Sequence, residues 1–191
     1  MASAHDVGPS DEWDESSTLT GPCSTLSADG HRNLAPHSYF NLVADIPPHI
    51  AFSLIGFKDT LRNIHATGEF VVNLASRRIL AALDASAASL APDEDEFEFA
   101  GVTPVPARRV RSPRVAEASA HFECVLAEVV PIGNGNVVIK RVVHVHVDPS
   151  IWRDRRVAPD LLDPVVRLSR RYGVLGTAYT PEEEPSPHVL S

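Results

Sequence analysis

The strongest chemical signal in this chain lies at 52–63, where polar residues interrupt an apolar stretch. The stretch ends near Ser53, a loop with Gly56 follows, and helix-forming residues begin near Thr60. The first amide groups of a helix lack intrahelical partners and carry a partial positive charge, so they can bind an anion. Lys58 would add a cation and the two hydroxyls would add donors, which together could hold a phosphate. On spacing alone, an ordinary capped helix with a solvated lysine is the better-supported interpretation.

Histidines at a spacing of two form another candidate for chemistry. Valines alternate with His144, His146 and Asp148, which predicts a strand with the three polar side chains on one face. Such a face can bind a metal if a third ligand approaches. We favour a solvent-exposed strand face and predict no metal site. His121, next to Phe122 on another predicted strand, is expected to be structural.

Two further groups of residues have chemistry that depends on their surroundings. A basic cluster could attract a phosphate-bearing ligand or a partner subunit, or could be a solvated loop; it comprises Arg108, Arg109, Arg111 and Arg114. The two cysteines, Cys23 and Cys124, form no C-x-x-C motif, so we expect free, unreactive thiols in a reducing compartment.

Strand patterns dominate the elements that must position these residues. The segments predicted as strands are Ser38–Val43, His49–Ile55, Glu69–Leu74, Ser119–Ile132 and Asn136–Asp148. The last two flank Gly133-Asn134-Gly135, whose residues tolerate a positive φ and predict a tight hairpin turn.

Helical patterns are fewer and shorter. Asp59 or Thr60 can cap a helix that Gly68 would end. Further helices are expected at 77–88, which is rich in alanine and leucine, and within 160–171. Many strands with a few short helices predict a mainly β fold, a barrel with helical additions.

Length and composition allow one domain with a substantial core. The 191 residues are 43% hydrophobic and 22% charged, with a formal net charge of −8. This acidity argues against binding nucleic acid or an anionic membrane. No apolar run approaches the roughly 20 residues of a membrane span, and no signal peptide is indicated, so we expect a cytoplasmic protein. Residues 1–18 and 179–191 are predicted to be flexible.

Several motifs in order resemble one known family. They are Ser24-Thr25, Asn33-Leu34-Ala35-Pro36, Phe52-Ser53, Lys58-Asp59-Thr60-Leu61-Arg62-Asn63, Gly68-Glu69-Phe70-Val71-Val72-Asn73, Asp95-Glu96-Phe97-Glu98, Pro113-Arg114-Val115 and Glu123-Cys124. Together they resemble the flavin reductase-like proteins, which fold as an FMN-binding split β-barrel with Greek-key topology. The resemblance covers roughly residues 19–178.

The resemblance implies a set of cofactor-binding residues. Those expected near the flavin ring are Thr25, Asn33, Ala35, Pro36, His37 and Ser38. Those expected to hold the phosphate are Ser53, Lys58 and Thr60, while Asn63 could reach the phosphate or brace the loop. No catalytic residue is identified: His37 could lie over the flavin ring and act there, or it could merely occupy a variable position.

The function implied is transfer of hydride from NAD(P)H to FMN, in a homodimer with the flavin near the subunit boundary. A monooxygenase or another electron acceptor could be a partner. The alternatives are an FMN-binding electron carrier, a flavin-binding module without catalysis, or a barrel that has lost flavin. Two departures from the family pattern stand out. The first strand is expected to be shortened at 20–23, which motivates the last alternative. A Lys140-Arg141 pair stands in place of Gly-Arg and is expected on the surface.

Overall fold

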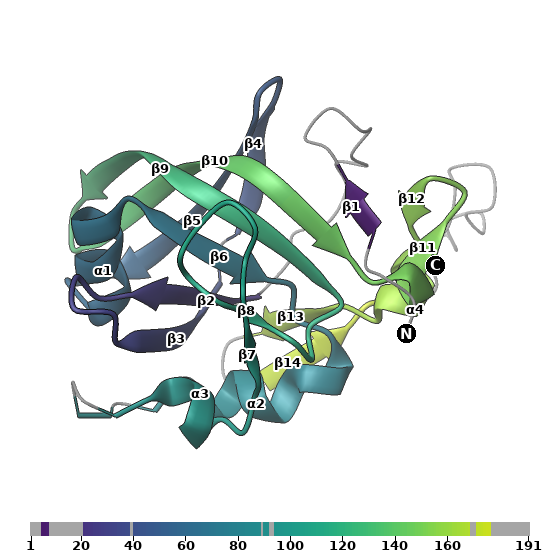
Figure 1. Ribbon diagram of the computed structural model, residues 1–191, viewed down its shortest axis with the longest axis horizontal. Coiled ribbons are helices and arrows are strands. Elements are labelled where there is room, and N and C mark those ends of the chain that lie inside the picture. Colours follow the sequence, from purple (N-terminus) through teal and green to yellow (C-terminus); the bar gives the residue numbers. More distant parts are fainter. Residues whose placement is uncertain are drawn as a thin grey trace, which may run out of the picture.

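The computed structural model describes residues 21–38, 40–88, 90–91, 94–168 and 171–176, and the backbone of His5–Val7. Apart from the backbone of His5–Val7, the two segments predicted to be flexible, 1–18 and 179–191, lie outside the described residues. Most strands form one eight-stranded antiparallel sheet, in the order β3-β2-β6-β9-β10-β5-β4 with β1 paired to β10. The sheet curls into a barrel in which β3 approaches β5 (Figure 1). The main sheet contains β1 (His5–Val7), β2 (Gly21–Leu26), β3 (Arg32–His37), β4 (Asn41–Asp45), β5 (Pro48–Ile55), β6 (Glu69–Asn73), β9 (Ala120–Ile132) and β10 (Gly135–Val147).

Short elements surround the barrel. Three two-stranded sheets are formed by β7 (Pro104–Val105) with β8 (Arg114–Val115), β11 (Trp152–Arg153) with β12 (Arg156–Val157), and β13 (Val165–Leu168) with β14 (Arg171–Val174). The helices are α1 (Asp59–Thr67), α2 (Leu80–Ala85), α3 (Glu96–Phe99) and α4 (Pro159–Leu162), with 3-10 turns η1 (Arg77–Ile79) and η2 (Pro149–Ile151). None of these described helices is long and apolar enough to cross a membrane.

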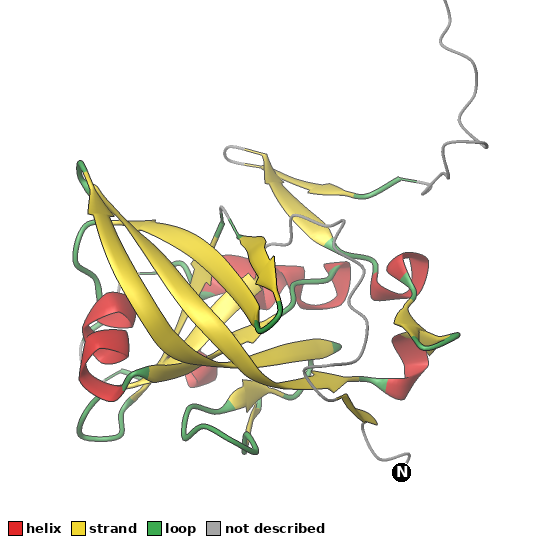
Figure 2. Ribbon diagram, turned by 90° about the horizontal axis from the view of Figure 1, so that it is seen from above, coloured by secondary structure: helices red, strands yellow, loops and turns green. Residues whose placement is uncertain are grey.

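The β9–β10 hairpin is the longest feature of the barrel, and Figure 2 shows its two strands curving together across the molecule. Its turn lies at Gly133-Asn134, with φ of 58° at Gly133, as the glycine-rich sequence predicts. The pairing shifts register at Ile139/Lys140 and again at Val142/His144. The second shift interrupts strict alternation, so Val142, Val145 and Val147 face the core while Val143 does not.

The first barrel strand exists although its sequence disfavours one. β2 begins at Gly21 and pairs with β3 along its whole length, but with β6 only at Cys23 and Ser24. A Cβ on Gly21 would overlap the backbone carbonyl oxygen of Asn73. Glycine is therefore needed here because two backbones approach closely, which is a use of glycine within strands.

Helix α1 has the predicted extent but a different start. Gly68 ends it in the left-handed conformation, with φ of 71°, and its N–H bonds to the carbonyl of Ile64. The cap position belongs to Lys58, whose side chain makes no capping hydrogen bond. The prediction that Asp59 or Thr60 caps the helix was therefore wrong, since both already lie within its first turn.

Two other predictions need correction. The helix expected within 160–171 is only the single turn α4, because Asp163 adopts a left-handed conformation and Pro164 forms a bridge to Ser76 before β13 begins. The strand expected at 38–43 begins only at Asn41, as β4, and the strand before it, β3, ends at His37. The strands expected at 49–55, 69–74, 119–132 and 136–148, and the helix expected at 77–88, are confirmed within a few residues.

The barrel interior holds the main core and one unexpected charge. Its apolar side chains include Phe40, Phe52, Phe70 and Phe122. Lys140, predicted on the surface, is fully buried, and its Nζ lies 3.9 Å from the centre of the Phe52 ring. The reason is local: on β10, Val138, Lys140 and Val142 follow a period of two and face the interior together.

Candidate functional site

Side chains from β2, β3 and α1 meet in one buried hydrogen-bond network beside the first turn of α1. Asn33 Nδ2 donates to Thr25 Oγ1 at 3.1 Å and to Thr60 Oγ1 at 3.3 Å. Asn63 Nδ2 also donates to Thr25 Oγ1, at 3.0 Å. His37 Nε2 lies 3.3 Å from Thr60 Oγ1. Five residues that the sequence singled out are thus brought together, although 38 positions separate the first from the last.

This network fixes the start of α1 against the β2–β3 hairpin. The Thr25 and Thr60 hydroxyls are completely buried and already have protein partners, so their present role is to hold backbone segments in place. Asn63 bonds inward to Thr25, which agrees with the bracing alternative for this residue.

His37 lies at the inner end of the network as a neutral imidazole. Its ring stacks on Phe52, with centroids 4.6 Å apart. Burial, together with the charges of Lys140 and Lys58, lowers the pKa of His37 to about 3. An imidazole with this pKa carries no charge near neutral pH, so His37 can shape the site but cannot supply a cation to it.

The remaining predicted residues flank the network and keep some exposure. Lys58 is exposed at the N-cap of α1, and Ser53 is half-buried on β5 opposite Val137. Ala35 and Pro36 are half-buried on β3, and Ser38 is half-buried just after this strand. Within the described residues, no side-chain hydrogen bond joins Lys58, Ser53 or Ser38 to the network. The site therefore consists of a buried hydrogen-bond network with more accessible polar side chains around it.

The two thiols do not contribute chemistry. Cys23 and Cys124 are both free and buried in the barrel, as predicted. Burial raises the pKa of each to about 12, so both stay protonated and unreactive.

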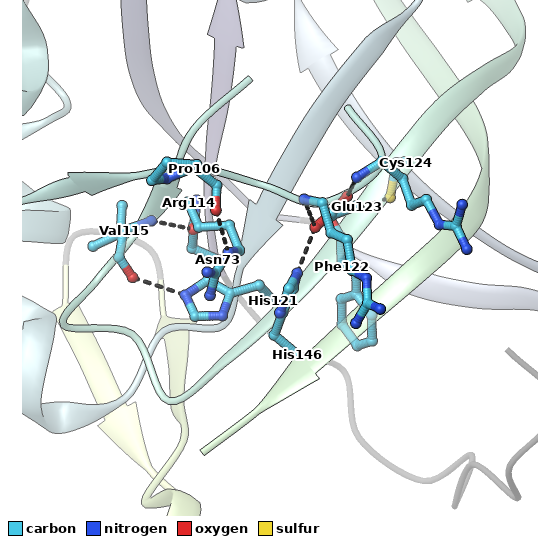
Figure 3. A network of polar contacts seen from close by, with 11 residues as sticks. Asn73, Pro106, Arg114, Val115, His121, Phe122, Glu123, Cys124 and His146 are labelled. Atoms are coloured by element: carbon cyan, nitrogen blue, oxygen red, sulfur yellow. Dashed lines mark hydrogen bonds and ion pairs between the residues drawn. The ribbon is translucent and has the colours of Figure 1, made fainter. Parts of the chain in front are cut away.

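A second buried polar group lies on the outer face of β9 and β10, and the sequence did not predict it. His144 and His146 were expected on a wet strand face, but each is almost fully buried, under 10% exposed. Their neighbour is Glu123 on β9, which accepts a hydrogen bond from His146 Nε2 (Figure 3). Asp148 instead accepts from the backbone N–H of Ser150 and starts η2. The available signal was an acidic residue, Glu123, between the apolar or uncharged residues Phe122 and Cys124 on the strand that pairs with the histidines.

The loop between β7 and β8 that contains Arg108, Arg109 and Arg111, called the arginine loop below, contacts this group through its backbone. The N–H groups of Arg108 and Arg109 donate to the two carboxylate oxygens of Glu123, at 2.7 and 2.5 Å. Alongside, His121 Nε2 donates to the carbonyl of Val115 at 2.7 Å, which agrees with a structural role for this residue (Figure 3). The basic cluster is therefore partly an anchored loop over the barrel wall.

Comparison with known proteins identifies the class. Residues 16–170 match the family described as flavin reductase like domain, so the chain belongs to this family. A protein of Aquifex aeolicus (strain VF5) is 35% identical over 160 residues, covering 81% of this chain and 82% of the relative.

Solved structures agree with this assignment. Nitrilotriacetate monooxygenase component B from Bacillus cereus has a TM-score of 0.83 at 34% identity, covering 85% of this chain and 86% of that one. Flavoredoxin of Desulfovibrio vulgaris (Miyazaki F) has a TM-score of 0.78 at 28% identity, covering 85% and 89%. The predicted family and the mainly β split-barrel fold are thus confirmed, and a flavin-related oxidoreductase role is supported.

Proposed function

We propose that this protein binds FMN at the start of α1 and transfers hydride from NAD(P)H to it. The observation that carries the proposal is the uncapped start of α1. No described side chain accepts a hydrogen bond from its first backbone N–H groups, and Lys58 is exposed at the N-cap position. The first backbone N–H groups of a helix attract an anion, and a lysine beside them adds charge. A phosphate is the anion that this combination suits.

The residues around the first turn fit the rest of the cofactor. Asn33 to Ser38 form a strand edge whose middle residues, Ala35 and Pro36, are half-buried and small enough to lie against a flat ring. The buried network of Thr25, Asn33, Thr60 and Asn63 holds this strand and the helix start at a constant separation. Flavin, when bound, supplies the two-electron chemistry, and the protein supplies position and electrostatics.

Catalysis in this proposal needs no acid or base from the protein. Hydride transfer depends on placing the donor and acceptor rings in contact, so the side chains act mainly by orientation. The neutral His37 agrees with such a role, because it adds no charge beside the ring. The proposal also includes NAD(P)H as the donor, a homodimer, and delivery of electrons to a monooxygenase or another acceptor. Similarity to a monooxygenase component B supports an acceptor of that kind.

Titration with FMN and with riboflavin, followed by flavin fluorescence, tests the phosphate site. We expect Lys58→Ala to weaken FMN binding by roughly 10-fold, since a charge-assisted contact contributes about 1.5 kcal/mol or more, and to leave riboflavin almost unchanged. Arg141→Ala, which removes an exposed charge from β10 instead, is the control and should affect neither ligand strongly. Equal weakening of both ligands by Lys58→Ala would contradict the phosphate assignment.

Rapid mixing separates the reductase from the electron carrier. The FMN-loaded protein should lose the visible absorbance of oxidised flavin when NADH or NADPH is added without oxygen. Bound FMN that only a partner protein can reduce would favour the carrier. Absence of FMN binding in the wild-type protein would favour a barrel that has lost flavin.

A further inference from the structure

Three potential metal ligands converge on the outer wall of the barrel, at the opposite end of β10 from its hairpin turn. Glu123 on β9 lies directly across from His144 on β10, and His146 is two residues further along the same face. One ligand atom from each of the three lies within 4.8 Å of the others. Two histidines at a spacing of two on a strand, with a carboxylate from the neighbouring strand, can bind one ion from three sides.

The position of the carboxylate is held from outside the group. Glu123 is completely buried, and the backbone N–H groups of Arg108 and Arg109 each bind one of its oxygens. Hydrogen bonds of this kind orient a ligating carboxylate while leaving it further lone pairs. The group therefore has an outer shell of the type that orients ligands in metal sites.

The donor set selects a class of ion. Two imidazoles and one carboxylate suit a first-row divalent metal such as Zn²⁺, and three protein ligands leave a fourth position open. Bonds of about 2.0–2.2 Å place tetrahedral ligand atoms about 3.4 Å apart. The three ligand atoms lie within 4.8 Å of one another, so their separations would change by up to about 1.4 Å, with His146 turning its Nε2 from Glu123 towards the ion.

We propose that Glu123, His144 and His146 form a binding site for one divalent transition-metal ion, with Zn²⁺ as its probe. The ion would link β9 and β10 beneath the arginine loop. The charges of Arg108 and Arg109 lie near His144 and oppose a cation in part, which favours an anionic fourth ligand.

Binding of Co²⁺ and Zn²⁺ to the untagged, flavin-free protein tests this proposal independently of the flavin site. The protein is first treated with a chelator and then titrated with Co²⁺, whose visible absorption reports coordination, followed by displacement with Zn²⁺. We expect one equivalent to bind. His144→Ala should weaken binding by at least about 100-fold, because loss of an outer-shell partner alone costs about 10–100-fold.

Two further variants sharpen the result. His65→Ala removes an exposed histidine on α1 and should bind metal like the wild type. Glu123→Gln should also lose the site, but this residue anchors a loop, so His144→Ala decides the matter if the glutamine variant does not fold. The proposal is overturned if the wild-type protein binds no Co²⁺ or Zn²⁺, or if His144→Ala binds them as tightly as the wild type does.

Discussion

Glu123 and Lys140 are completely buried on opposite faces of the β9–β10 hairpin, and their surroundings differ. On the outer face, Glu123 has three hydrogen-bond donors, from His146 and two backbone N–H groups. On the inner face, Lys140 has no hydrogen-bond partner within the described residues and lies instead against the rings of Phe40, Phe52 and Phe70, its Nζ 3.9–5.2 Å from their centres.

Glu123 therefore holds other groups in place through its hydrogen bonds, whereas Lys140 is buried without hydrogen bonds to described residues that would replace those it makes with water. A buried charge with several donors replaces its lost hydration, whereas aromatic faces replace only part of it. The consequence appears in the pKa values. Partners hold the pKa of Glu123 at about 2, which favours its charged form, while burial lowers the pKa of Lys140 to about 8, which disfavours its charged form.

Glu123→Ala should give the largest effect. It leaves the two loop N–H groups and His146 without their acceptor, and removing one member of a buried polar pair typically costs about 3–5 kcal/mol. The free energy of unfolding, measured in urea at pH 7, should fall by that amount. Glu128→Ala, an exposed glutamate on the same strand, is the control and should change little. Similar losses in both variants would remove the distinction drawn between the two faces.

Lys140→Met should have the opposite sign. Methionine fills a similar volume among the phenylalanines without the cost of burying an amine. We expect the free energy of unfolding at pH 7 to rise by about 2 kcal/mol, somewhat less than the pKa change implies because cation–π contacts are lost. Arg141→Met alters the exposed neighbour and should not stabilise the protein. A clear loss of stability in Lys140→Met would show that the aromatic contacts outweigh desolvation.

The advantage of Lys140→Met should also depend on pH. Between pH 8 and 10.5 the unfolded chain keeps the lysine proton that the folded wild type has released, so wild-type stability gains from rising pH by about 1.4 kcal/mol per unit at most. The difference between the two proteins should therefore be constant below pH 8 and shrink towards pH 10.5. The buried thiols have raised pKa values, so their contribution to stability falls as pH rises. Both proteins contain the same thiols, so this contribution cancels when the two are compared at each pH. A difference that does not change with pH would contradict a lowered pKa at Lys140.

The smallest effect is expected at an exposed ion pair. Arg62 pairs with Asp59 one turn away on α1, where both side chains are about half exposed. Water and salt screen such pairs, so Arg62→Ala should change the free energy of unfolding by about 0.5 kcal/mol or less. Thermal unfolding at low and high salt measures this. A loss comparable to that of Glu123→Ala would mean that burial is not what separates these charges.

Much of the fold follows from local patterns in the chain. Gly133-Asn134-Gly135 determines the hairpin turn, and Gly68 determines the end of α1, because each needs a positive φ that glycine adopts without strain. The ordered motifs from Ser24 to Cys124 sufficed to identify the family. They also named the residues of the network around Thr25 and Thr60, although not their mutual hydrogen bonds.

Only the tertiary structure decided which face of each strand became interior. A period of two places Lys140 with Val138 and Val142, but composition alone favoured the surface for a lysine. The register shift between Val142 and His144, and the pairing of β10 with β9, turned the two histidines towards Glu123 and under the arginine loop. Register and coverage depend on contacts between residues far apart in the chain, and a local pattern carries no information about them.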